Sequence, residues 1–469
     1  MSTTRRAEDT TAIARESARG AALGLGLTLV LMAAATAVPL LTGWEIFTHS
    51  TIEGDEFPPL HSRWDPKVGP GTVPAVLIAV AALLGARRVA ERLSWGPLLA
   101  VAYAVGLAWM LSLAFVDGPE GISRVLGNPY EYLITAREVT DVPAMIDGFT
   151  ERIPYAHPDN WVVHIAGHPP GALLFFVVLD RLGLGGDFTA GMVVTVLAAT
   201  TSVAVMVAMR CLGAEALVRR ALPFLVLGPA ALFMAVSADA LFAATAAWGL
   251  ALMAIAGTRT SRPAMAAWGV AAGLLLGWTV MTSWGLPIMG VLALTVLWLT
   301  RSWWLFPVVA LSALGVVLAF AAYGFFWWEA FPVLRERYWD GLAADRPAAY
   351  WLWGNLAALA YAAGPAVGAG LGRLATLRPG RRVEEVATET GSDPRAVRAL
   401  VAMSTAAVAV VVLADASRMS KAEVERIWLP FVPWLLLATA LLPARWRTPV
   451  LALNLVVALV VQHLFYTSW

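Results

Sequence analysis

The feature that most constrains this chain is a series of uninterrupted apolar runs, most of them long enough to cross a membrane. A transmembrane α-helix needs about 20 mostly apolar residues, and it satisfies its backbone hydrogen bonds internally. Hydrophobic residues fill 59% of the 469 positions and charged residues only 14%. An ordinary globular chain is about 45–50% apolar and about 25% charged. We therefore predict an all-α polytopic membrane protein.

Arginine placement predicts which connections face the cytoplasm, because cytoplasmic loops carry an excess of Lys and Arg. The arginine-rich segments are the N-terminal tail before residue 20, 87–92, 259–262, 373–398 and 445–447. The outer loops are then 43–71, 117–169, 327–353 and 416–426. The apolar stretches lie at 20–42, 72–86, 95–116, 170–184, 188–209, 221–236, 239–256, 264–282, 285–300, 303–326, 354–372, 399–415, 427–443 and 449–466.

Fourteen crossings are inconsistent with the sides of the membrane that the arginine-rich segments predict for the connections. One of these stretches is therefore not a full crossing. The short 170–184 stretch is the best candidate for a partial or re-entrant helix, which is tolerated where protein surrounds it. We therefore expect about 13 transmembrane helices in a single transmembrane domain spanning 1–469, with no separate soluble domain. Its parts are an N-terminal two-helix extension (1–94), a core (95–443) and a C-terminal helix (444–469).

The charge balance excludes several classes of partner. Lys plus Arg (33) nearly equals Asp plus Glu (32), so no field of one sign recruits nucleic acid. Cys211 is the only cysteine, which forbids an internal disulfide. The expected partner is the lipid bilayer. Because the chain is rich in Ala, Gly and Val and uses Arg far more than Lys, as in GC-rich bacterial genomes, we expect a multi-pass protein of the bacterial plasma membrane.

The loop 117–169 is too long to be a simple connector. Its run Asn128-Pro129-Tyr130-Glu131 has the pattern of a capping box, with an N-cap side chain and a Glu three residues later. A second helix start follows at Asp141-Val142-Pro143. Apolar residues recur at helical spacing after each start. We therefore predict two interfacial helices within 129–150.

Two histidines close this loop, His164 and His168, directly before Pro169-Pro170-Gly171 and an apolar run. Four residues apart on a helix they would share a face and suit a metal ion. Pro169, however, disfavours the helical conformation at His168, and no Glu or Cys stands nearby at ligand spacing. We predict hydrogen bonding to a substrate or phosphate, with a purely structural role and metal binding as alternatives.

The order of these features resembles the GT-C superfamily of polyprenyl-phosphate-sugar-dependent glycosyltransferases. In that superfamily an acidic residue ends a helix at the outer face, two juxtamembrane helices follow, and a Pro-Pro motif opens the next helix. A basic residue before a Leu-Pro-x-x-Pro helix lies near the C-terminus. The matching features here, between about 95 and 443, are Asp117, the 129–150 helices, His168-Pro169-Pro170-Gly171 and Arg426-Ile427-Trp428-Leu429-Pro430-Phe431-Val432-Pro433.

The resemblance implies transfer of a sugar from a polyprenyl-phosphate-linked donor to a cell-envelope glycan or lipid acceptor on the extracytoplasmic side. Asp117 would be the catalytic base. Many members instead carry an adjacent acidic pair before an aromatic residue, which Asp55-Glu56-Phe57 matches better, so Asp55 and Glu56 are the alternative. Some relatives use a divalent cation, which this pair would suit. We assign no metal ligands, and we expect a deep outer pocket near Asp117.

The departing phosphate requires positive charge, and Arg binds phosphate oxygens in pairs. Arg346, beside Pro347, and Arg426, before the Leu-Pro-x-x-Pro run, are the leading phosphate ligands. A structural alternative for Arg426 is a pair with Glu423 or Glu425. Asp239, near the start of an apolar stretch, is either functional or a helix N-cap. The remaining predicted substrate or phosphate contacts are His164, His168, Arg337, Tyr338, Glu120 and Glu131, with Lys421 as a weaker one.

Two other function classes stay open. A transporter or flippase of lipid-linked sugars would carry charged residues in mid-span and matching halves with interrupted helices, neither of which the sequence shows. A non-enzymatic subunit for envelope assembly would tolerate replacement of Asp117 or Arg346. The sequence does not specify the sugar, the acceptor, the linkage or the oligomeric state.

Overall fold

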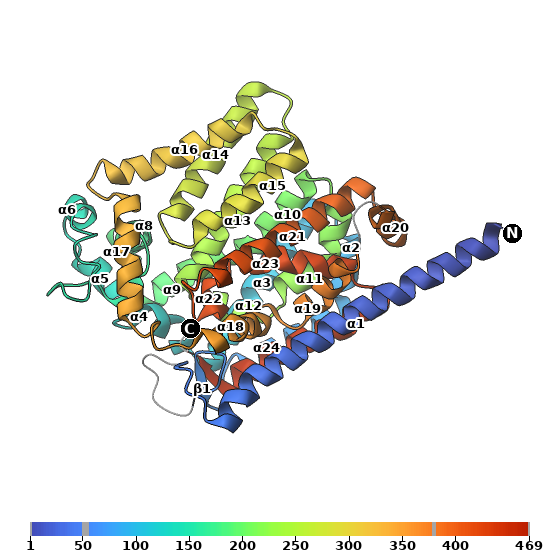
Figure 1. The fold of residues 1–469 in the computed structure, drawn as a ribbon, viewed down its shortest axis with the longest axis horizontal. Coiled ribbons are helices and arrows are strands. Elements are labelled where there is room, and N and C mark those ends of the chain that lie inside the picture. Colours follow the sequence, from blue (N-terminus) through green and yellow to red (C-terminus); the bar gives the residue numbers. More distant parts are fainter. Residues whose placement is uncertain (1, 49–55, 378–380, 468–469) are drawn as a thin grey trace.

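The computed structural model describes the backbone of residues 2–48, 56–377 and 381–467, and the side chains of 15–48, 56–377 and 383–467. Helices dominate these residues (Figure 1). Two short antiparallel strands, β1 (Ser62–Trp64) and β2 (Phe465–Thr467), pair Ser62 with Thr467 and so join the 43–71 loop to the C-terminus. The expected all-α class is confirmed.

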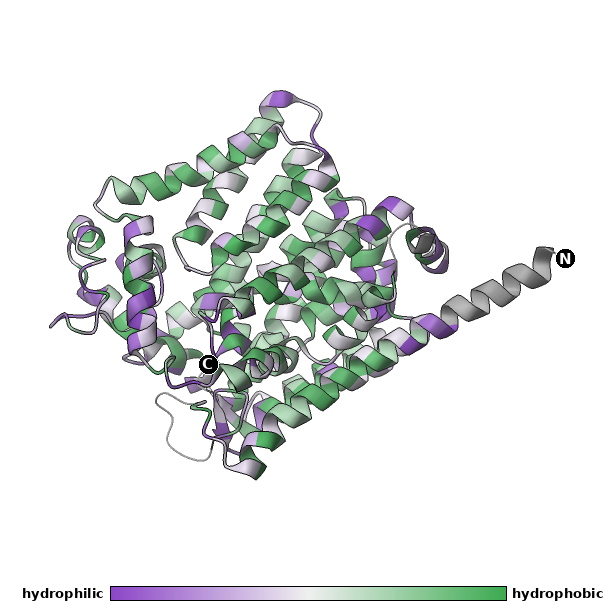
Figure 2. Ribbon diagram, in the orientation of Figure 1, coloured by the Kyte–Doolittle hydropathy of each residue, from purple (hydrophilic) through white to green (hydrophobic). Residues whose placement is uncertain are grey.

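Among the described residues, eight helical segments are long and apolar enough to cross a membrane. Figure 2 shows hydrophobic residues along their length, with hydrophilic residues gathered near α17 and near α20. Leu27, Leu77 and Leu311 are exposed on the outside of the bundle, as residues facing lipid would be. The eight segments are α1 (Ser2–Thr42), α2 (Thr72–Arg92), α3 (Trp95–Ala114), α9 with α10 (Asp187–Ala198, Thr200–Cys211), α13 (Ala238–Gly257), α14 (Arg262–Val280), α21 (Pro394–Ala416) and α24 (Ala444–Leu464).

Shorter helices fill the rest of the bundle and its two ends. We call the end that carries residues 117–169 the loop end, and the opposite end, where α20 lies, the α20 end (Figure 1). The shorter elements outside 117–169 are α8 (Pro170–Arg181), α11 (Glu215–Val226), α12 (Ala230–Met234), η2 (Leu286–Met289), α15 (Gly290–Thr300), α16 (Leu305–Ala321), α17 (Trp327–Asp340), α18 (Ala348–Ala363), α19 (Ala366–Ala375), α20 (Arg381–Thr390), α22 (Val424–Ile427), α23 (Val432–Leu436) and η3 (Leu437–Leu441).

The 170–184 stretch forms the short helix α8, which does not run to the α20 end. Its twelve residues reach about 18 Å, whereas a bilayer core is about 30 Å thick. The Arg181 guanidinium at its C-terminus donates to the Thr140 carbonyl at 3.0 Å, and Gly185 just beyond accepts from Arg137 at 2.6 Å. Both ends of α8 therefore lie against the loop 117–169, as expected of a partial helix.

The loop 117–169 folds into four short helices after the 3-10 turn η1 (Phe115–Asp117). They are α4 (Glu120–Gly127), α5 (Tyr132–Glu138), α6 (Val142–Asp147) and α7 (Val163–Ala166). The start of α6 is as predicted, because Asp141 caps it by accepting from the Ala144 amide at 3.0 Å.

The predicted capping box at Asn128 is wrong. Asn128 instead accepts from the Tyr130 amide at 2.9 Å in a tight turn, and α5 begins later, at Tyr132. Glu131, the expected capping partner, is 1% exposed and turns its carboxylate into the protein interior. The reason is a set of buried charged partners, described below, whose pairing outweighs a local cap.

Two helical paths through the bundle are interrupted, between α11 and α12 and between α18 and α19. The backbone groups freed there are bound by side chains: Trp109 Nε1 donates to Gly228 O at 3.2 Å, and Asn454 Oδ1 accepts from the Ala366 amide at 2.9 Å. Asn454 Nδ2 also donates to Ala363 O at 3.4 Å. An apolar environment requires this, since an unsatisfied backbone group there costs several kcal/mol.

Small residues let α1 lie directly against α19. A Cβ atom built on Gly24 would stand 2.1 Å from Gly368 O, and one built on Gly372 would stand 2.4 Å from Gly20 O. Glycines at such crossings allow backbones to approach closely in membrane proteins. The N-terminal helix is therefore packed against the later part of the chain.

Gly24→Leu should separate α1 from α19 and lower the free energy of unfolding by about 1–3 kcal/mol or more, because the added side chain overlaps backbone atoms. The matched control is Gly26→Leu, since nothing lies within 4 Å of a Cβ at Gly26. The measurement is the thermal unfolding midpoint of the purified full chain in detergent. Equal midpoints for the two variants would contradict this packing.

Candidate functional site

At the loop end, Arg426 lies at the centre of a buried cluster of charged side chains. It belongs to α22, and its side chain is 3% exposed. Arg426 Nη1 lies 3.3 Å from Asp239 Oδ2 and 3.5 Å from Glu131 Oε1, and its Nη2 lies 3.7 Å from Glu423 Oε2. Buried ionised groups require such pairing, because desolvation of a lone charge costs several kcal/mol. The Glu423 pair is the one expected from sequence.

Local backbone geometry holds two of these carboxylates in place. Asp239 lies in the first turn of α13, where Ser237 is the N-cap and its Oγ accepts from the Asp239 amide at 3.1 Å. Asp239 is therefore a charge at a helix N-terminus and not the N-cap itself. Val236 has φ +106° and Glu423 φ +60°, in the left-handed region that non-glycine residues rarely adopt. Such strained residues cluster at functional sites.

His164 is held between Glu131 and Arg426. Its Nδ1 lies 2.6 Å from Glu131 Oε1, and its Nε2 lies 3.3 Å from Arg426 Nη2. Arginine offers donors only, so Nε2 accepts and the ring proton lies on Nδ1, facing the glutamate. Burial alone would raise the pKa of Glu131, but His164 and Arg426 outweigh it and lower that pKa below its ordinary value.

His168 lies beside the cluster in an aromatic pocket. Its Nδ1 donates to the His164 carbonyl at 2.7 Å, and its ring centroid lies 5.9 Å from that of Tyr132 and 5.5 Å from that of Phe242. Burial lowers the pKa of His168, because its charged form loses hydration. His168 is therefore neutral near pH 7 and presents Nε2 as an acceptor.

Arg346 is linked to the cluster through Glu423, at 3.1 Å. Its guanidinium also donates to three backbone carbonyls: Phe47 at 3.0 Å, Lys421 at 2.7 Å and Thr48 at 3.3 Å. Burial opposes ionisation of Glu423, but Arg346, with smaller contributions from His61 and Arg426, lowers the pKa of Glu423 to about 2. Arg346 therefore fastens the 43–48 segment to residues 421–423.

Asp117 lies outside this cluster. Its Oδ1 is 2.8 Å from Lys67 Nζ, and its Oδ2 accepts from Gln462 Nε2 at 3.0 Å. Two cavities lie at the α20 end, and neither is lined by Asp117, beside which we expect an outer pocket. The role of Asp117 as a base stays a prediction, and in this structure its carboxylate joins α24 to the 43–71 loop.

The other predicted contacts are dispersed. Arg337 donates to the carbonyls of Ile153 and, at 2.7 Å, of Trp161, so it fastens α17 to the loop 117–169. Tyr338 accepts from the Lys421 amide at 3.0 Å, and Glu120 is exposed at the start of α4. Glu56 accepts from the Thr48 amide at 3.3 Å. Asp55 lies outside the described residues.

The sequence predicts most residues of the cluster as site residues, but it does not predict that they contact one another. Glu423 and Glu425 were noticed only as partners for Arg426, yet Glu425 is fully buried and accepts from the His61 amide at 3.0 Å. Charged residues placed directly before the apolar run 427–443 were the available signal. Within the part of the chain that the structure describes, no group of three or more His, Cys, Asp or Glu side chains is arranged to hold a metal ion.

Comparison with known proteins yields no relative: no protein family, curated protein or solved structure matches this chain.

Arg426→Gln should lower the free energy of unfolding by about 3–5 kcal/mol, because the buried carboxylates of Glu131 and Asp239 lose their shared counter-charge. Adding Asp239→Asn to this variant should restore part of the loss by removing one unpaired charge. Arg335→Gln, on the exposed side of α17, is the control and should stay within about 0.5 kcal/mol of wild type. Denaturant unfolding in detergent measures all three, and a null effect of Arg426→Gln would contradict the central role of this charge.

The low pKa of Glu423 predicts a specific acid sensitivity. A carboxylate whose pKa is lowered on folding stabilises the fold fully above its ordinary pKa near 4.5, and this contribution is lost as the pH falls toward about 2. Glu423→Gln should therefore unfold at a lower temperature near neutral pH but lose less on acidification than wild type. Thermal unfolding across this pH range tests it, with the exposed Glu336→Gln as control. Parallel curves would refute the assignment.

Proposed function

We propose that this protein is an integral-membrane glycosyltransferase that takes a sugar from a polyprenyl-phosphate donor and adds it to a cell-envelope glycan or lipid. The observation that supports the proposal is the cluster at the loop end, where one buried arginine contacts three carboxylates and a histidine. Ionisable groups buried near membrane-spanning helices are costly and are functional candidates by default. The order of motifs that resembles GT-C enzymes supplies the reaction class.

The reaction needs a base and a stabilised leaving group. The acceptor hydroxyl gives its proton to a carboxylate while its oxygen forms a bond to the anomeric carbon of the donor sugar. The bond from that carbon to the phosphate oxygen breaks, and the phosphate departs with the electron pair. A guanidinium can stabilise the charge that develops on the phosphate.

Asp239 is our choice for the base within the cluster. Its Oδ2 accepts no hydrogen bond among the described residues and lies 3.3 Å from Arg426 Nη1, so an acceptor hydroxyl bound there would lie beside a phosphate held by Arg426. Glu131 is already engaged by His164 and would position that ring. Asp117, the base implied by the resemblance, is the rival assignment. Arg426, Glu131 and Asp239 are buried in this structure, so substrate entry requires the segment carrying Glu131 and His164 to open.

We further propose a topology of thirteen crossings. The eight long segments cross once each, and the segments 215–234, 286–300, 305–321, 348–375 and 424–441 supply five more. Alternate connections then gather at the same end. At the α20 end Ser302 Oγ donates to Gly257 O at 3.2 Å, and at the loop end Gly324 lies against Asp147. In this proposed topology the arginine-rich connections lie in the cytoplasm and the C-terminus lies outside, on the plasma membrane of a bacterium.

The transporter alternative has one observation in its favour, the interrupted paths α11–α12 and α18–α19. Discontinuous helices of transporters offer free backbone groups to their substrates. Here Trp109 and Asn454 bind the backbone groups at the two breaks, so these groups are not open to a ligand. The glycosyltransferase proposal therefore has the better support.

The test is a deletion strain complemented with wild type, Asp239→Asn, Glu131→Gln or Asp117→Asn. The deletion should truncate an envelope glycan or lipid while the lipid-linked donor accumulates, and wild type should restore the product. Asp239→Asn should lower product formation by about 10²–10⁴-fold, the range for loss of a general base. Glycan analysis measures the product of the reaction, and quantification of lipid-linked sugars measures the donor.

Asp345→Asn, an exposed carboxylate at the loop end, is the matched control and should restore the product fully. Each variant must insert to the wild-type level. If Asp117→Asn fails while Asp239→Asn restores the product, the base assignment passes to Asp117. If the donor accumulates only on the cytoplasmic face of the deletion strain, the protein moves the donor across the membrane and the transferase proposal is wrong.

A further inference from the structure

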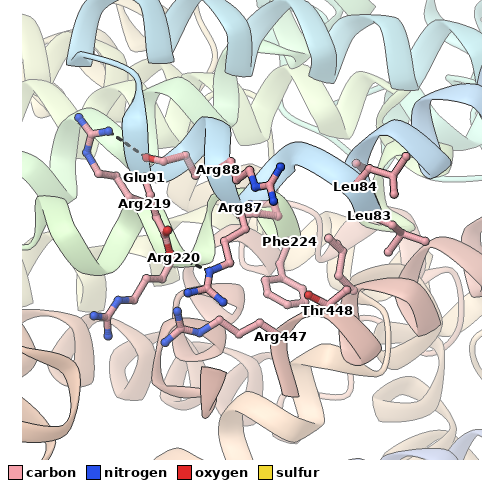
Figure 3. A pocket seen from close by; sticks show the side chains of 14 residues that line it. Leu83, Leu84, Arg87, Arg88, Glu91, Arg219, Arg220, Phe224, Arg447 and Thr448 are labelled. Atoms are coloured by element: carbon pink, nitrogen blue, oxygen red, sulfur yellow. Dashed lines mark hydrogen bonds and ion pairs between the residues drawn. The ribbon is translucent and has the colours of Figure 1, made fainter. Parts of the chain in front are cut away.

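At the α20 end two adjoining cavities of about 180 and 360 Å³ share four lining residues. The shared residues are Arg87, Glu91, Arg220 and Arg447. They come from α2, α11 and α24, which are far apart in sequence. Figure 3 shows Arg87, Arg220 and Arg447 reaching the same side of the cavity from these three helices.

The lining carries an excess of positive charge. Arg87, Arg88, Arg219, Arg220 and Arg447 line the smaller cavity, and Glu91 is the acidic residue among its lining. Glu91 is paired with Arg87 at 2.9 Å, and Glu389, which lines the larger cavity, is paired with Arg373 at 2.9 Å. Arg88, Arg220 and Arg447 make no ion pair among the described residues. Glu91 and Glu389 act on Arg220 and Arg447 without a direct contact among the described residues, so arginines outnumber carboxylates in this lining.

Most donors of two of these arginines have no hydrogen-bond partner among the residues that the structure describes. Arg447 Nε donates to Leu442 O at 3.1 Å, and Arg220 Nη2 donates to Thr390 O. A guanidinium offers five N–H groups, so each retains several donors, and its planar fork fits two phosphate oxygens. Both arginines are half-buried, which orders the side chains and strengthens their field.

The other wall of the smaller cavity is apolar and continues onto the outside of the bundle. Leu83, Leu84 and Phe224 line it, and Leu84 is 76% exposed. In a membrane-spanning fold this surface faces acyl chains. The cavity therefore joins a cationic floor to a lipid-facing apolar wall, which matches a phosphate carried on a lipid better than a free phosphate.

We propose that this arginine cavity binds the phosphate group of an anionic membrane lipid, in the leaflet on the side of the α20 end. Basic pockets between membrane helices on the cytoplasmic side bind such headgroups, and each arginine near the surface contributes about 1 kcal/mol. The site stands apart from the cluster around Arg426 and does not depend on the proposed reaction. The bound lipid would hold α2, α11 and α24 together by neutralising cations that otherwise repel one another.

The test is lipid titration of the purified full chain in detergent, followed by native mass spectrometry. Wild type should bind phosphatidylglycerol and retain it over phosphatidylcholine. Arg220→Gln combined with Arg447→Gln should weaken phosphatidylglycerol binding by about tenfold or more. Arg88→Gln removes an exposed arginine that has no ion pair with the described residues, and it should weaken phosphatidylglycerol binding about fivefold. This variant covers the case that the double variant does not fold.

The matched control is Arg262→Gln, an exposed arginine of α14 outside the cavity, which should bind phosphatidylglycerol as wild type does. A competition experiment adds glycerol 3-phosphate, a soluble phosphate. It should not displace phosphatidylglycerol when the two are present at similar concentrations. Wild-type binding by Arg88→Gln or by a folded double variant, or equal binding of phosphatidylcholine, would overturn the proposal. Displacement by glycerol 3-phosphate at similar concentration would also overturn it, because the site would then take a soluble phosphate.

Discussion

Burial of the Arg426 charge is the constraint on which the loop end of this protein depends. A guanidinium that is 3% exposed in an apolar fold requires counter-charges, and three segments supply them: the loop 117–169 through Glu131, the N-terminus of α13 through Asp239 and the turn before α22 through Glu423. Arg346 then extends the network to the 43–48 segment. Two arginines thus fix how four parts of the chain meet.

The bundle beneath this cluster shows how irregular backbone is accommodated in an apolar setting. The break after α11 and the break after α18 lie against each other, since a Cβ on Gly228 would stand 3.8 Å from Ala363 O. The side chains of Trp109 and Asn454 complete the hydrogen bonds that the two breaks leave open. Short half-helices such as α12 and α19 are possible here because protein, and not lipid, surrounds their ends.

The two ends of the molecule differ in how their charged side chains are paired. At the loop end Arg426 is buried and pairs with Glu131 and Asp239 within the protein, and Asp239 Oδ2 is the carboxylate oxygen that we propose for chemistry. At the α20 end the arginines that line the cavities outnumber the carboxylates there, and we propose that a lipid headgroup supplies further counter-charge. A largely buried cluster suits a reaction that must exclude water, whereas a cationic cavity suits binding of a headgroup.

The sequence by itself determined the class of this protein, because apolar runs and helical hydrogen bonding leave few folds for such a composition. It also located the short α8, the helix start at Asp141 and most of the charged residues of the cluster. Only the tertiary structure decided which charges meet: Glu131 reads as a local helix cap in sequence but pairs with Arg426, 295 positions away. Asp117, singled out by its place at a helix end, pairs with Lys67 instead. The packing of distant helices determines which buried charges pair, and a local sequence pattern does not indicate that packing.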